Sequence, residues 1–171
     1  MKRLLFLLFV SVIIFASGCL NEVVKPNIEL NPKVQKIISD NYVSNMRCTS
    51  EDIKLILDYA KAYGIQNPYI PTKGVATDYI VEIRKEDDAL AIIYPHFSIR
   101  ESSKEIPPIN KVEQEKSVKL AVSDGKWRKV EGNAPQLYLK LGNVYITIDS
   151  AKYLDEKEYE TIAESLVQIK K

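Results

Sequence analysis

The fold is decided by residues 137–166, which read LYLKLGNVYITIDSAKYLDEKEYETIAESL. The first half alternates apolar and polar residues on both sides of Gly142-Asn143, and its apolar positions are Leu137, Leu139, Leu141, Val144, Ile146 and Ile148. A two-residue period around a glycine turn predicts a β-hairpin with one buried face. The second half predicts a helix, because Asp155 and Glu158 have the spacing of a capping box. The apolar face of this helix contains Tyr159, Ile162, Ala163, Leu166 and Val167.

More strands are predicted upstream of this hairpin. Residues 75–84 alternate with a two-residue period and predict a half-buried strand, and residues 85–88 predict a polar turn. Residues 89–100 predict a more apolar strand, and Pro95 within it indicates a bend or an edge position. A long polar loop over residues 101–115 precedes another hairpin, whose turn signal is Asp124-Gly125.

Two helices are predicted before the strands. The first begins at Pro32 and places Val34, Ile37, Ile38 and Tyr42 at helical spacing. The second begins at Thr49, with Asp52 in the capping-box position, and ends at Gly64. The whole pattern predicts an α+β fold, in which an antiparallel, curled sheet of about six strands is preceded by two helices and closed by a C-terminal helix.

The order strand, glycine turn, strand and acidic-start helix over residues 136–168 resembles the end of an exported prokaryotic domain known as DUF4367. That domain is related in style to lipoprotein-sorting and anti-sigma-regulator folds. The resemblance implies a half-open antiparallel barrel covered by helices, and some members of the wider group hold lipid chains or lipoprotein peptides in the concave face. The matching motifs are packing motifs, and any strand–turn–strand–helix unit would produce them, so no functional residue is transferred.

The N-terminus has the three-part layout of a secretory signal. Lys2 and Arg3 are followed by the apolar residues 4–15, broken only by Ser11, and then by small residues up to Gly18. A helix that spans a bilayer needs roughly 20 apolar residues. The shorter run therefore favours a cleaved signal over a permanent transmembrane helix, although residues 4–20 would span a thin bilayer if left uncut.

The stretch Ala16-Ser17-Gly18-Cys19 resembles a lipobox, the processing site of prokaryotic lipoproteins. The resemblance implies cleavage between Gly18 and Cys19 and attachment of the lipid to the Cys19 thiol. Ala16 departs from that pattern, in which leucine is most common at this position. The same residues also fit an ordinary secretory cleavage site, which would give a soluble secreted protein with a free N-terminal cysteine.

Three segments follow from these patterns: a signal peptide over residues 1–18, a lipidated cysteine and tether over 19–32, and a single domain over 33–171. Prolines and asparagines in the tether disfavour a packed element. Acyl chains contribute about 0.8 kcal/mol for each buried CH₂, so a diacylated or triacylated cysteine is a stable anchor. The expected location is the extracytoplasmic face of the cell membrane, with the membrane as a partner through the lipid.

Composition limits the class of function. Hydrophobic residues make up 46% and charged residues 27% of the chain, which is ordinary for a globular domain. Removal of residues 1–18 takes Lys2 and Arg3 from the 24 basic residues and leaves 22 against 23 acidic ones. This balance gives no electrostatic reason to expect nucleic-acid binding. Cys19 and Cys48 are the two cysteines, so at most one disulfide would form.

No residue pattern indicates catalysis, a metal site or a cofactor. His96 is the single histidine and is expected on a strand, facing solvent or hydrogen-bonded locally. The acid pairs Asp87-Asp88 and Glu113/Glu115 fall in predicted turns, where solvated carboxylates are common. Cys48 is expected to be a small buried apolar group.

These observations predict a membrane-anchored extracytoplasmic lipoprotein that is not an enzyme. The expected activity is binding of a hydrophobic ligand or a partner polypeptide in a cleft between the sheet and its helices. A structural or accessory envelope lipoprotein is the alternative, and an envelope hydrolase that uses His96 or the acid pairs comes last.

Overall fold

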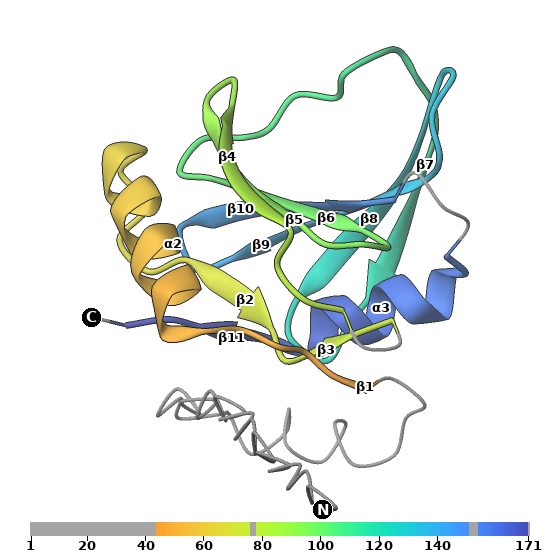
Figure 1. The fold of residues 1–171 in the computed structure, drawn as a ribbon. Helices are drawn as coiled ribbons and strands as arrows, with labels where there is room; N and C mark the ends of the chain where they lie inside the picture. Colours follow the sequence, from red (N-terminus) through yellow and green to blue (C-terminus); the bar gives the residue numbers. More distant parts are fainter. Residues whose placement is uncertain (1–43, 76–77, 151–153, 171) are drawn as a thin grey trace, which may run out of the picture.

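The computed structural model describes residues 44–75, 78–150 and 154–170, drawn in colour in Figure 1. Their fold is α+β, as the sequence predicts, with an antiparallel sheet as the main element. The signal peptide, the Gly18–Cys19 cleavage site, the tether and the first predicted helix up to residue 43 lie outside the described residues.

A seven-stranded sheet forms the centre of the domain. Its strands lie in the order β4–β5–β6–β10–β9–β8–β7, and every neighbouring pair is antiparallel. The strands are β4 (Glu82–Glu86), β5 (Ala89–Ile93), β6 (Ser98–Ser102), β7 (Val112–Lys119), β8 (Asp124–Val130), β9 (Gln136–Leu141) and β10 (Val144–Asp149). The sheet is open, with β4 and β7 at its edges, so the predicted curling is wrong.

Helices and short strand pairs cover one face of this sheet (Figure 1). The helices are α2 (Ser50–Ala62) and α3 (Glu156–Glu164). The two short pairs are β2 (Tyr69–Pro71) with β11 (Leu166–Gln168), and β1 (Ser44–Asn45) with β3 (Lys73–Gly74). Neither α2 nor α3, the helices within the described ranges, is long and apolar enough to cross a membrane.

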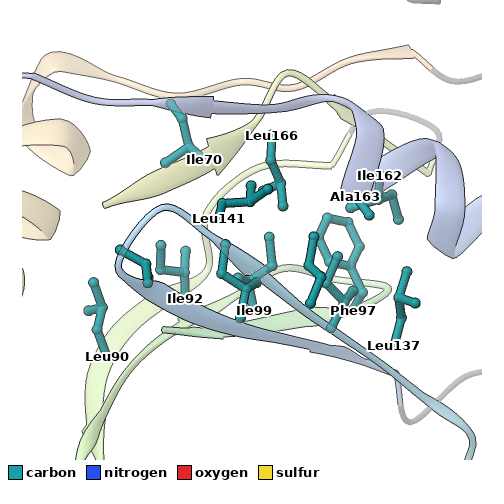
Figure 2. Packing of buried hydrophobic residues seen from close by; sticks show 14 of the residues in the cluster. Ile70, Leu90, Ile92, Phe97, Ile99, Leu137, Leu141, Ile162, Ala163 and Leu166 are labelled. Atoms are coloured by element: carbon teal, nitrogen blue, oxygen red, sulfur yellow. The ribbon is translucent and has the colours of Figure 1, made fainter. Parts of the chain in front are cut away.

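The core lies between the sheet and this covering layer (Figure 2). Strand residues such as Ile92 and Ile99 face Ile162 of α3 and Leu166 of β11, and all four are buried. Side chains from both layers therefore fill the space between the sheet and its helices, where a ligand cleft is predicted from the sequence.

Local signals at the ends of elements are confirmed. Both predicted capping boxes form, from Thr49 and Asp52 at α2 and from Asp155 and Glu158 at α3. Gly64 follows α2 with a φ of 69°, and this left-handed conformation favours glycine.

Other boundaries differ from the prediction. The expected strand over residues 75–84 is wrong for residues 78–81, because β4 begins only at Glu82. The apolar run 89–100 is two strands, β5 and β6, since the chain reverses around Pro95. The last helix ends at Glu164, and Leu166–Gln168 forms a strand that pairs with β2.

The second face of the sheet carries polar side chains. The register places Arg84, Ala91, Arg100, Thr147, Tyr138, Lys126 and Ser117 in one row across all seven strands. We call this side the polar face. The loop of residues 103–111 connects β6 to the far edge strand β7 and passes over the polar face (Figure 1).

Candidate functional site

Two hollows open on the polar face beside the 103–111 loop, and Glu105 of the loop lines both. The loop is anchored by Ile106, which is buried, whereas its neighbours on both sides are exposed.

The first hollow, which we call the arginine hollow, has a volume of about 370 Å³. Its lining residues come from the β4–β5 turn, the centre of the sheet and the loop, and they are Glu86, Asp87, Asp88, Ala89, Arg100, Ser102 and Lys104 to Ile109. The loop contributes an apolar wall through Ile106, Pro107, Pro108 and Ile109, whereas the turn contributes carboxylates.

Arg100 lines this hollow and carries a buried hydrogen-bond donor. Its side chain is 8% exposed, and Nη2 lies 3.2 Å from Oδ2 of Asp149 on the neighbouring strand β10. The Ser98 hydroxyl donates to the other oxygen of Asp149. Nε of Arg100 has no hydrogen-bond partner among the described residues. Because Asp149 balances the charge of Arg100, the free N–H suits a neutral acceptor such as a carbonyl oxygen.

Burial raises the pKa of Asp149, and the hydrogen bond from Ser98 and the charge of Arg100 act in the opposite direction. The arginine and the serine hydroxyl thus favour the ionised form that pairs with Arg100. This arrangement holds the guanidinium in place at the base of the hollow.

The second hollow, which we call the lysine hollow, has a volume of about 460 Å³. Its charged lining residues are Glu105, Lys119, Asp124, Lys126 and Lys140, and Tyr138 and Tyr145 lie among them. The Tyr138 ring lies beneath the guanidinium of Arg128, 4.1 Å from its centroid. Burial, followed by the charge of Glu105, raises the pKa of Tyr138 to about 12, so its hydroxyl stays protonated.

His96 lies in the turn between β5 and β6, so its predicted strand position is wrong. Its Nδ1 lies 2.5 Å from Oδ1 of Asp78, a fully buried carboxylate that also accepts a hydrogen bond from the Val75 backbone N–H. The pair therefore joins the segment before β4 to the β5–β6 turn. Asp78 was not singled out from the sequence, because its partner is 18 residues away.

The acid pairs do not converge with His96. Asp87 and Asp88 lie at the rim of the arginine hollow. Glu113 pairs with Lys129, and Glu115 pairs with both Lys126 and Arg128 of the adjacent strand. Across the described ranges no group of three His, Cys, Asp or Glu side chains has the arrangement of a metal site.

Two further titratable groups lie in the core layer. Burial, together with the charge of Asp52, raises the pKa of the Cys48 thiol to about 12, which keeps it in the unreactive protonated form. Glu101 on β6 is fully buried, and the Tyr69 backbone N–H donates to both of its carboxylate oxygens at 3.0 and 3.1 Å. Sequence reasoning missed Glu101 because the predicted strand ended one residue before it.

Comparisons with protein-family models, curated proteins and solved structures found no match.

Proposed function

We propose that this chain is a membrane-anchored extracytoplasmic lipoprotein that binds a partner polypeptide in the arginine hollow of its polar face. The signal pattern and Cys19 support the anchor and the location. The geometry of the arginine hollow supports the binding role.

A partner polypeptide is favoured over a wholly hydrophobic ligand because of where the apolar surface lies. The space between the sheet and its helices is occupied by the side chains of the core. The arginine hollow is instead an open surface feature, with an apolar wall beside charged groups. A polypeptide offers both apolar side chains and backbone carbonyls, so it matches both parts of this lining.

The unpartnered Nε of Arg100 is the observation that carries the proposal. A buried donor without an acceptor lowers stability, and a ligand removes that cost if its carbonyl reaches Nε after the enclosing side chains move aside. Since Asp149 already pairs with the arginine, a peptide carbonyl fits better than a second carboxylate.

The rim of the hollow indicates the charge of the partner. Four carboxylates line it, from Glu86, Asp87, Asp88 and Glu105, whereas the cations are Arg100 and Lys104. The excess negative charge favours basic side chains that flank an apolar residue. The proposed partner segment is therefore basic and apolar, and contains an extended stretch of backbone.

Titration with defined peptides tests this proposal on the full chain in non-ionic detergent. The probe is a blocked peptide of about six residues, the usual length of a strand, with alternating isoleucine and lysine. We expect saturable binding, and binding at least about tenfold weaker when glutamate replaces lysine. Equal affinity for both peptides would contradict the proposal.

Substitution at the rim locates the site. Ile109 is 58% exposed, so Ile109→Ser leaves the fold intact and removes one apolar contact. We expect the peptide affinity to fall about fivefold, which corresponds to about 1 kcal/mol of apolar burial. Leu55→Ser on α2 is the matched control, because Leu55 is 44% exposed and lies outside the lining of the hollow.

A structural or accessory role is the second candidate, and two exposed apolar residues favour it. Tyr79 and Val81 are 53% and 56% exposed, and they lead into the edge strand β4. The test is chemical cross-linking in intact cells with a double Tyr79→Ser and Val81→Ser variant. Loss of a cross-linked partner in this variant, but not in Ile109→Ser, would favour the accessory role.

A further inference from the structure

We propose that the lysine hollow is a second binding site, which takes a phosphate group. The group belongs either to the headgroup of an anionic lipid or to a small phosphorylated molecule. This site uses different residues from the arginine hollow and does not depend on the proposed binding of a polypeptide.

Tyr138 provides an unused donor at this site. Tyr138 as a whole is 8% exposed, and its hydroxyl has no hydrogen-bond partner in the part of the chain that the structure describes. Tyr138 lies between Lys126 and Thr147 in the sheet register, and the Arg128 guanidinium covers its ring. The hydroxyl is enclosed in the unliganded chain, so an acceptor in the hollow becomes its partner only when the neighbouring side chains move aside.

Lysine side chains supply positive charge beside this hydroxyl. Lys126 is already paired with Glu115 at 2.8 Å. Among the described residues, Lys119 and Lys140 form no ion pair with a carboxylate, and Lys140 Nζ donates to the Tyr145 hydroxyl at 3.1 Å. Two ammonium groups and one hydroxyl thus line one hollow from β7 and β9. The same lining contains Lys126 and the carboxylates of Glu105 and Asp124, so its three lysines exceed its two acids by one positive charge.

The number of donors favours a phosphate group. Phosphate presents at least three acceptor oxygens and up to two negative charges, which match two ammonium groups and a hydroxyl. A single carboxylate carries one negative charge, and would leave the charge of one ammonium group unbalanced. The volume of about 460 Å³ leaves room for the group to which the phosphate is attached.

Lysine acetylation of the full chain in non-ionic detergent tests the site directly. Each lysine is followed by mass spectrometry while inorganic phosphate is titrated. We expect Lys119 and Lys140 to react about tenfold more slowly at saturation, because a bound anion occupies their ammonium groups. Lys54 on α2 and Lys157 on α3 are both exposed and serve as internal controls.

Two variants separate specific binding from general charge screening. Tyr138→Phe removes only the hydroxyl. The phosphate concentration that half-protects Lys119 and Lys140 from acetylation should therefore rise about tenfold. The unfolding midpoint of this variant should stay unchanged or rise. Bound phosphate should also slow the acetylation of Lys126, the third lysine of the hollow, in the wild type but not in the double variant Lys119→Gln and Lys140→Gln. The control is the double variant Lys54→Gln and Lys157→Gln, which carries the same change in net charge. In this control, phosphate should slow the acetylation of the lysines of the hollow as in the wild type.

A second arm of the experiment identifies the source of the phosphate. The full chain is placed in vesicles of phosphatidylcholine alone, or of phosphatidylcholine with phosphatidylglycerol. Protection only in the anionic vesicles assigns the site to a lipid headgroup, whereas protection by inorganic phosphate without any effect of the vesicles assigns it to a small molecule. Absence of protection in both arms, or equal slowing at Lys54 and Lys157, would overturn the proposal.

Discussion

At the scale of single residues, Glu101 links stability to pH. Its pKa is raised by burial from 4.5 to about 8, and the hydrogen bond from Tyr69 opposes this shift only in part. The folded chain therefore keeps a proton that the unfolded chain releases between these two values. Glu101 therefore contributes fully to the free energy of unfolding below about pH 4.5, and this contribution is lost as the pH rises to about 8.

The substitution Glu101→Gln should remove this dependence. Glutamine keeps an acceptor for the Tyr69 N–H and never ionises, so the variant should exceed the wild type in stability by a few kcal/mol at about pH 9. Denaturant unfolding from about pH 5 to about pH 9 measures the difference between the two curves. Parallel curves would show that Glu101 does not titrate in this range.

Arg100→Lys separates the charge of this residue from its free donor. Lysine retains a cation for Asp149 but lacks the Nε–H of the arginine fork. We expect peptide affinity to fall about tenfold, while the unfolding free energy changes by about 1 kcal/mol or less. Calorimetric titration and denaturant unfolding of the same preparation distinguish these effects, and an unchanged affinity would remove Arg100 from the site.

At the scale of elements, the N-terminus of α3 is held by a reciprocal pair. The Asp155 side chain accepts from the Glu158 N–H at 2.8 Å, and Glu158 accepts from the Asp155 N–H at 2.9 Å. Asp155→Ala should therefore cost about 1 kcal/mol of unfolding free energy. Lys157→Ala on the same helix is exposed and should be nearly neutral, so a similar loss in both variants would argue against a capping effect.

Elements set by local interactions were predictable from the sequence, and elements set by distant pairing were not. The β9–β10 hairpin and both capping boxes depend on residues a few positions apart. In contrast, Leu166 carries the helical spacing of the last helix but pairs with Pro71 in a short sheet. The partner strand is far away in sequence, and its pairing outweighs the local preference.

The candidate site was less predictable for the same reason. Arg100 and Asp149 are joined by the register between β6 and β10, which no local pattern specifies. Tyr138 occupies an ordinary polar position of an alternating strand, and it is buried in the fold, where the Arg128 guanidinium covers its ring. Composition and spacing therefore predicted the scaffold, whereas both hollows required the tertiary arrangement.

At the scale of the whole molecule, the two faces of the sheet have separate roles. One face packs against α3, β2 and β11 to form the core, and the other carries both hollows. Charged residues make up four of the five positions of β4, EIRKE, and four of the eight positions of β7, VEQEKSVK. Charged edges discourage pairing between sheets of separate molecules. We therefore expect partners to bind at the polar face rather than along the sheet edges.

The proposed anchoring at a membrane depends on Cys19, and substitution of this residue gives a matched test. If Cys19 carries the lipid, Cys19→Ser should leave an unprocessed or released chain without acyl mass, because serine has no thiol for the modification. Cys48→Ser is the control, since the other cysteine lies within the folded domain and should not affect lipidation. Intact-mass spectrometry and membrane fractionation of both variants measure the outcome. An N-terminus at Cys19 without added mass would indicate an ordinary secretory signal, and an intact N-terminus in wild-type membranes would indicate a retained helix.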